Sequence, residues 1–146
     1  MGLTKCAICG CSIHRGGKYA VPTIEGRSHA TRHHYVAERL FGRSATRKGE
    51  QREPIFKDCP WGLEKQSLEF CYECHEELLH NPVFLPADIC RFAELVRLRD
   101  LDESEKTASK DKIARRIELL HEVIEEGVKA LLVAERAKPS LRSNLR

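Results

Sequence analysis

The stretch CYECHEELLHN, residues 71–81, carries the signals that decide the fold of this chain of 146 residues. It joins a C-x-x-C pair, Cys71 and Cys74, to two histidines, and its apolar residues recur at helical spacing. A second C-x-x-C pair, Cys6 and Cys9, stands near the start of the sequence. One such pair is a weak signal, whereas two pairs provide the four thiolates of a tetrahedral zinc site. We therefore predict a structural zinc ion held by these four cysteines, in preference to a redox pair or free thiols.

Three further cysteines, Cys11, Cys59 and Cys90, stand alone, and seven thiols cannot all pair within one chain. In a reducing cytosol, cysteine pairs of this kind usually hold zinc rather than form disulfides. We expect Cys90 to pack as a small hydrophobic residue, while Cys11 is close enough in sequence to compete as a ligand. Only 6% of the residues are aromatic, so a metal ion would offset a thin core.

The chain has no apolar run near the roughly 18 residues that a transmembrane helix needs. Its amino-terminal stretch also lacks the apolar centre of a signal peptide. We expect a soluble, cytoplasmic protein with no membrane partner.

The formal net charge of +3 is the average of two unlike regions. Residues 1–57 contain 11 Lys/Arg and 4 Asp/Glu, a balance of +7, whereas residues 58–146 have a balance of −4. A basic region suits a polyanionic partner, because neutralised phosphates release their counterions. The side chains that we expect to grip phosphates are Arg39, Arg43, Arg47 and Lys48. The alternative is a solvated loop without a partner.

The sequence pattern predicts an α+β fold. Weak strand character extends over residues 19–37, followed by a long, polar and aperiodic loop at 38–66. A short strand is expected at 67–70, and a helix from Cys71 to about residue 81.

Two longer helices are predicted after this region, at 87–101 and from 110 to about 137. Ser109 is the expected N-cap of the second helix. Its apolar stripe is wide, so something must cover it: the preceding helix, the zinc domain or a second chain in a homodimer. The apolar positions are Ile113, Ile117, Leu120, Ile124, Val128 and Leu131.

These elements predict three segments. Residues 1–85 form a small zinc-bound domain, residues 86–137 form a helical hairpin, and residues 138–146 form a basic, flexible tail.

Three motifs in their order along the chain resemble the HNH nuclease family in its zinc-braced branch. They are CAIC at 6–9, HHYVA at 33–37 and CYECH at 71–75, and the resemblance covers about residues 5–82. In that family a His pair ends the first strand of a ββα-metal hairpin, and a second C-x-x-C followed by His starts the helix. The resemblance implies this fold and a metal-dependent endonuclease that cuts double-stranded DNA.

The resemblance also implies roles for the histidines. His34 would be the general base, His33 and His75 would be metal ligands, and His80 would complete the site or lie just outside it. Phosphodiester hydrolysis needs a base for water and a cation that stabilises charge on the phosphate, and neutral imidazole is a natural base near pH 7. One divalent ion, Mg, Mn, Ni or Zn, would lie in this site, separate from the structural zinc.

The sequence departs from the family pattern at three positions. Where the family has a central Asn, nine residues before the helix histidine, this chain has Gln66, which would have to make the loop-bracing hydrogen bonds. The position four residues after His75 is Leu79, and His80 would lie about 100° round an α-helix from that position. Ala37 stands where the family often has Pro.

Two other functions fit the same residues. The first is a non-catalytic zinc module that binds nucleic acid or a protein partner. The second is a helical adaptor in which the zinc-bound segment only caps the C-terminal hairpin.

Overall fold

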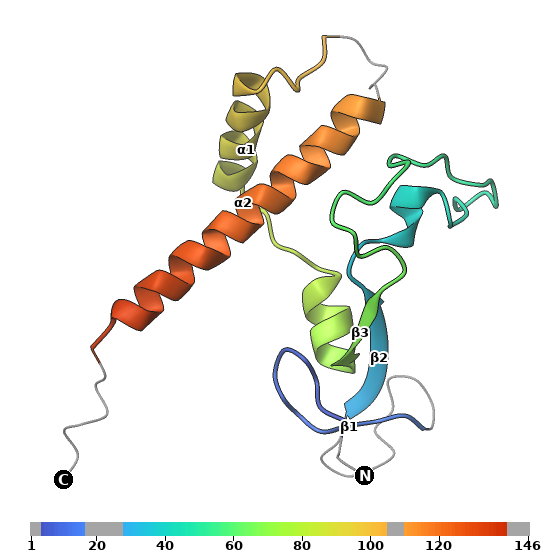
Figure 1. Cartoon of the computed structure of the whole chain (residues 1–146), viewed down its shortest axis with the longest axis vertical. Helices are drawn as coiled ribbons and strands as arrows, with labels where there is room; N and C mark the ends of the chain where they lie inside the picture. The colour runs from blue at the N-terminus through green and yellow to red at the C-terminus, as the bar shows by residue number, and fades with distance from the viewer. Residues whose placement is uncertain (1–3, 17–27, 105–109, 140–146) are drawn as a thin grey trace. The chain divides into compact units, whose positions relative to one another are not determined.

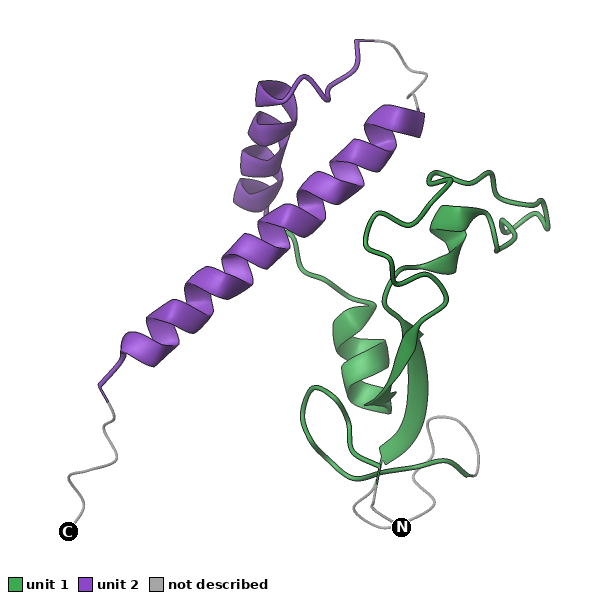
Figure 2. Cartoon of the chain, in the orientation of Figure 1, with its two compact units in different colours: residues 1–84 green, residues 85–146 purple. Residues whose placement is uncertain are grey.

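The computed structural model describes residues 4–16, 28–104 and 110–139. It confirms the α+β class: a small sheet of three strands is combined with helices. The chain divides into two compact units, Met1–Phe84 and Leu85–Arg146 (Figure 2). The predicted border between the zinc-bound domain and the helical hairpin was after residue 85, one residue later.

The sheet of the first unit has the strand order β1-β2-β3 (Figure 1). Strand β1, Ile13–His14, pairs in parallel with β2, Ser28–His34, which pairs antiparallel with β3, Ser67–Cys71. Thr31 lies opposite Phe70 in the register, and its hydroxyl donates a 3.0 Å hydrogen bond to the Phe70 carbonyl. Both residues are buried, because directly opposed residues of paired strands point to the same face of the sheet. The first part of the strand predicted at 19–37 lies outside the described residues.

The first cysteine pair lies in a tight turn that leads into β1. The Cys6 amide donates to the Cys11 carbonyl at 2.9 Å, and the Gly10 amide donates to the Cys6 carbonyl at 3.0 Å. Gly10 has φ +74°, a conformation that glycine adopts without steric cost. The core of this unit consists of Cys6, Ile13, Phe70, Cys71 and Cys74. Since three of these five residues are cysteines, the core depends on whatever holds the sulfurs together.

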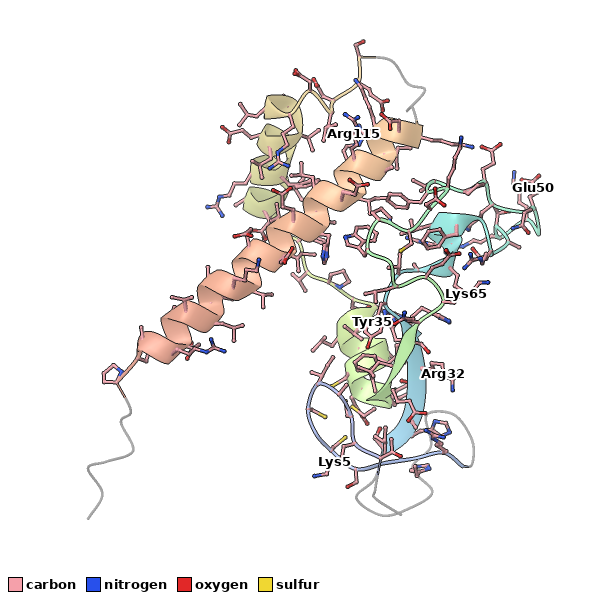
Figure 3. The ribbon with its side chains drawn as sticks, viewed as in Figure 1. Lys5, Arg32, Tyr35, Glu50, Lys65 and Arg115 are labelled. Carbon is pink, nitrogen blue, oxygen red and sulfur yellow. The ribbon has the colours of Figure 1, made fainter. Side chains whose placement is uncertain are left out.

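The segment between β2 and β3 is more ordered than the sequence predicted. It begins with a 3₁₀ turn, η1, Glu38–Phe41, and a bridge between Ala45 and Gln51 closes a turn at its far end, where Glu50 lies (Figure 3). An aromatic cluster stabilises this segment, which we call the insert (residues 38–66). Phe56, buried, lies 6.3 Å from the ring of Phe41 and 5.7 Å from that of Trp61. The expected loop therefore has a small core of its own.

The helix of the metal region, η2, Glu73–Leu79, is a π-helix, not the ordinary helix that was expected. Its backbone bonds reach five residues ahead, as in the 3.3 Å bond from the His80 amide to the His75 carbonyl. The Asn81 side chain donates to the carbonyls of Glu76, at 2.6 Å, and Glu77, at 3.4 Å. Asn81 thus caps carbonyls at the end of this helix.

The second unit contains two helices, α1, Pro86–Leu98, and α2, Lys110–Ala137 (Figure 1). The helix predicted to end at residue 101 ends at Leu98, because the chain turns at Asp100, with φ 54°, and the Leu101 amide donates back to the Val96 carbonyl. Val96, Leu101 and Leu119 form the core between the helices. The predicted N-cap Ser109 lies outside the described residues.

Among the described helices, none combines the length and the apolar character needed to cross a bilayer.

Candidate metal centres

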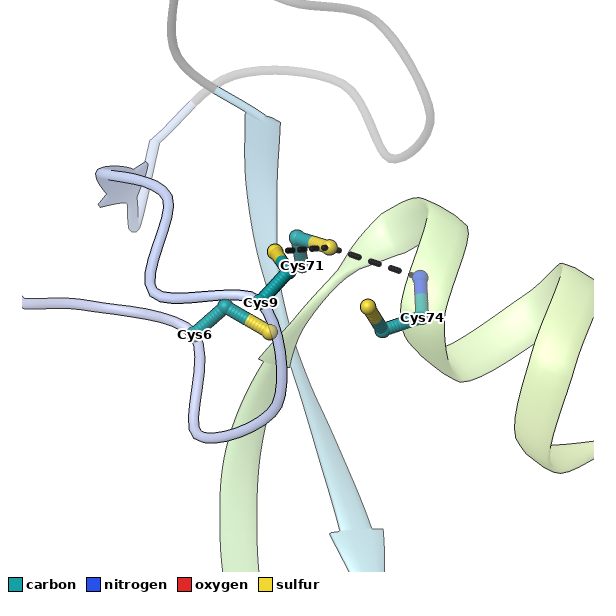
Figure 4. A group of neighbouring side chains, drawn as sticks. All are labelled: Cys6, Cys9, Cys71 and Cys74. Atoms are coloured by element: carbon teal, nitrogen blue, oxygen red, sulfur yellow. Dashed lines mark hydrogen bonds between the residues drawn. The ribbon is translucent and has the colours of Figure 1, made fainter. Parts of the chain in front are cut away.

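The four cysteines of the two C-x-x-C pairs lie together in the first unit (Figure 4). Their sulfur atoms all lie within 4.8 Å of one another, and the Cys9 and Cys71 sulfurs are 3.8 Å apart. A tetrahedral ion with Zn–S bonds of about 2.3 Å has edges of about 3.8 Å. The group can therefore hold a metal ion, and it joins the turn before β1 to the start of η2.

Backbone amides around this group favour thiolates. Burial by itself raises the pKa of the Cys6 thiol, but backbone N–H groups of Cys71, Cys9 and Ile8 act on its sulfur and lower the pKa to about 6. A hydrogen bond from the Cys11 backbone lowers the pKa of Cys9. Burial raises the pKa of Cys71 and of Cys74, because removing a thiolate from water disfavours its charged form. A divalent cation removes this conflict, so the donor set fits zinc.

The other three cysteines are not members of this group of four. Cys11 packs against the same core, and burial raises its pKa to about 12, which favours a neutral thiol. Cys90, expected to be packed, is instead exposed on α1, and Cys59 is half-buried in the insert.

A second group brings together three of the predicted site residues, His33, His75 and His80, with ligand atoms within 4.8 Å of one another. The ring centres of His33 and His75 are 5.1 Å apart, and those of His75 and His80 are 4.4 Å apart. The Nδ1 atom of His75 is buried and has no hydrogen-bond partner. An orphaned buried nitrogen beside two more imidazoles fits a divalent ion, because imidazole is a common ligand of Zn, Ni, Cu and Fe.

The π-helix explains how His80 joins this group. In an α-helix, residues four apart share a face, and Leu79 would then lie below His75. In η2 each backbone hydrogen bond joins a residue to the one five positions later, so the helix turns less per residue than an α-helix. A residue five positions after His75 therefore lies on the same face as His75. The sequence departure at Leu79 is therefore compensated by the winding of the helix.

Burial lowers the pKa of both His33 and His75, and neighbouring histidines lower it further. We expect nuclear magnetic resonance titration of the zinc-loaded protein, without a second ion, to give midpoints for both rings below the ordinary histidine value of about 6.5. The unfolded chain then takes up protons on these rings at a higher pH than the folded chain. The free energy of unfolding should consequently decrease as the pH falls below about 6.5. Midpoints at or above this value would contradict the packing described.

His34 and Gln66, the predicted catalytic residues, lie beside this group but not in it. His34 is the last residue of β2, on the opposite face from His33, and its Nε2 is 3.7 Å from a Glu38 carboxylate oxygen. The backbone carbonyl of Gln66 accepts a 3.1 Å hydrogen bond from the Tyr35 amide. The Gln66 side chain is exposed and makes no hydrogen bond within the part of the chain that the structure describes. The bracing of this loop is therefore made by the main chain.

The four predicted phosphate-binding residues are all exposed in the insert, but their surroundings differ. Arg47 and Lys48 lie in the turn closed by Ala45 and Gln51. Arg43 forms an ion pair with Glu64, and its guanidinium carbon lies 5.3 Å from the ring centre of Phe41. Its charge is therefore largely compensated by groups of the same chain. Arg39 is exposed on η1.

The sequence prediction missed one charged residue at the histidine group. Glu76 lies next to His75 and four residues before His80 in η2, and its carboxylate contacts both rings. Its spacing from His80 was the available signal, but a glutamate four residues from a histidine is common on exposed helices.

Comparisons with known proteins add no identity. No protein-family model matches the chain, and neither does any curated protein or solved structure.

Proposed function

We propose that this protein is a metal-dependent endonuclease that hydrolyses phosphodiester bonds of double-stranded DNA. The observation that carries the proposal is the convergence of His33 from a strand with His75 and His80 from the following helix, next to a group of four cysteines. This is the arrangement that the HNH resemblance implies. The test is nicking of supercoiled plasmid by the zinc-loaded protein with Mg, Mn, Ni or Zn.

In this proposal the histidine group holds one divalent ion, which supplies positive charge to stabilise the phosphate and the leaving oxygen. His34, at the end of the same strand, accepts the proton of the attacking water on its imidazole. The Glu38 carboxylate lies close enough to pair with the imidazolium that results. The main-chain bond between Tyr35 and Gln66 fixes the loop directly after the base.

The turn of Arg47 and Lys48 is the part of the insert best suited to contact DNA phosphates, because both side chains are exposed. The turn that presents them is itself ordered. The Thr46 amide donates to the Glu50 carbonyl at 2.7 Å, and the Gly49 amide donates to the Thr46 carbonyl at 2.9 Å. A fixed turn loses little conformational freedom when it binds.

Removing both charges, with Arg47→Ala and Lys48→Ala together, should weaken duplex binding and lower the slope of log K against log salt concentration by about 2. Fluorescence anisotropy at several salt concentrations, without an added divalent ion, measures this. The matched control is Arg91→Ala with Arg115→Ala, which removes two exposed charges from the second unit. Equal slopes for the two double variants would show that the turn makes no phosphate contact.

One observation favours a second candidate, a zinc module that binds nucleic acid or a protein without catalysis. The Gln66 side chain is exposed and, among the residues that the structure describes, makes none of the bracing bonds that the family's Asn would supply. A protein that binds DNA with one zinc ion but does not nick it with any of the four metals would establish this function instead.

We further propose that α2 joins two copies of the chain, so that two sites can cut both strands. Ile124, Val128 and Leu131 are between 51% and 68% exposed along this helix. The double substitution Ile124→Glu with Leu131→Glu should convert a dimer to a monomer in sedimentation velocity. Lys129→Glu, which reverses a charge on the same helix and breaks the ion pairs of Lys129 with Glu125 and Glu126, should leave the dimer intact. A wild-type chain that sediments as a monomer at high concentration would end this proposal.

A further inference from the structure

Glu76 lies between the two helix histidines of the metal group. One carboxylate oxygen is 3.4 Å from Nδ1 of His75, and the other oxygen is 3.4 Å from Nδ1 of His80. The side chain is 30% exposed, so most of it is enclosed by its neighbours. A single carboxylate thus contacts two of the three imidazoles.

The contact with His75 is not a hydrogen bond, since Nδ1 of His75 is buried without a hydrogen-bond partner. Leaving such a nitrogen unsatisfied costs roughly 1–3 kcal/mol. A tetrahedral ion with bonds of about 2.0–2.1 Å to nitrogen and oxygen separates its ligand atoms by about 3.4 Å. Each of the two separations, taken from a different oxygen of the carboxylate, therefore matches the distance between neighbouring ligands of one ion.

The winding of η2 produces this juxtaposition. Glu76 follows His75 directly, and His80 returns to the same side because the His80 amide bonds to the His75 carbonyl five residues back. The Asn81 side chain donates a 2.6 Å hydrogen bond to the main-chain carbonyl of Glu76, and so fixes the backbone of the residue that carries the carboxylate. An α-helix through the same residues would turn His80 away by about 100° from the position four residues after His75.

We propose that Glu76 is the fourth protein ligand of the divalent ion held by His33, His75 and His80. This inference rests on the metal site of the proposed function, but not on nuclease activity. A set of three imidazoles and one carboxylate suits a first-row transition ion such as Co, Ni or Zn better than Mg, which prefers oxygen ligands. The carboxylate also halves the net charge of the ion and its three neutral imidazoles, from +2 to +1.

The test is a titration of the full-length, zinc-loaded protein with Co²⁺, followed by calorimetry and by the visible absorption of the bound ion. Glu76→Gln removes the charge at constant shape and should lower Co²⁺ affinity 100-fold or more, since even an outer carboxylate is worth about 10–100-fold. It should also change the visible spectrum. Glu77→Gln, one residue along on the exposed side of the same helix, is the matched control and should behave as wild type.

Several results would overturn the inference. They are equal Co²⁺ affinity of the Glu76→Gln and Glu77→Gln variants, an unchanged spectrum in Glu76→Gln, and no second ion bound by the wild type. Retention of one zinc ion by each variant shows that the fold is intact. A wild type that binds Co²⁺ as expected but never nicks DNA would overturn the nuclease and leave the ligand role of Glu76 standing.

Discussion

Replacing Cys71 with serine should abolish tight zinc binding and unfold the first unit. Cys71 is 2% exposed and its sulfur lies 3.8 Å from that of Cys9, so serine would remove one of four ligands from the centre of the core. A structural zinc contributes on the order of 10 kcal/mol or more to folding, which is comparable with the whole stability of a small domain. We expect about one zinc per wild-type chain by elemental analysis, and loss of it in Cys71→Ser.

The matched control is Cys90→Ser, because Cys90 is exposed on α1 in the other unit. It should keep the zinc and the melting temperature of wild type. A buried cysteine can destabilise a fold for reasons unrelated to metal, so chelation of the wild type provides an independent measurement. Amide signals of the first unit should lose dispersion when the metal is removed and recover when zinc is returned. A Cys71→Ser protein that retains zinc and a folded first unit would refute the structural site.

His34→Ala should lower the rate of plasmid nicking by 10²–10⁴-fold, the usual contribution of a general base. His34 lies outside the group formed by His33, His75 and His80, so its loss should leave the binding of the divalent ion nearly unchanged. This separation of rate from metal affinity identifies a base rather than a ligand. The nicking rate and the Co²⁺ affinity are measured on the same preparation.

The control for this substitution is His121→Ala, which removes an imidazole from α2 in the second unit. It should nick plasmid at the wild-type rate. Equal nicking by His34→Ala and wild type would exclude His34 as the base. Absence of nicking by the wild type with Mg, Mn, Ni and Zn would exclude the nuclease itself.

The predictable parts of the fold are those that depend on the local spacing of cysteines and apolar residues along the sequence. Two C-x-x-C pairs indicated that four cysteines would meet, and the regular apolar positions of the last helix indicated its length. The predicted helix from 110 to about 137 corresponds to α2, Lys110–Ala137. Such patterns are read directly, because the spacing of ligands and apolar residues is dictated by bond geometry and helical period.

The winding of η2 could not be read from the sequence. Leu78 and Leu79 fit an α-helix and a π-helix equally well, and only the backbone bond between His75 and His80 separates the two. The prediction therefore left open whether His80 completes the site or lies just outside it, and gave Glu76 no role. The aromatic core of the insert was missed for a related reason: its residues are 15 and 5 positions apart and follow no period.

The insert contains the only tryptophan of the chain, Trp61, packed on Phe56. An indole is a fluorescent probe whose emission depends on its immediate surroundings, and here those surroundings belong to the aromatic cluster. Excitation of native protein therefore reports optically on the segment that contains Arg47 and Lys48, with no label attached. Emission recorded during DNA addition can therefore follow the response of this segment.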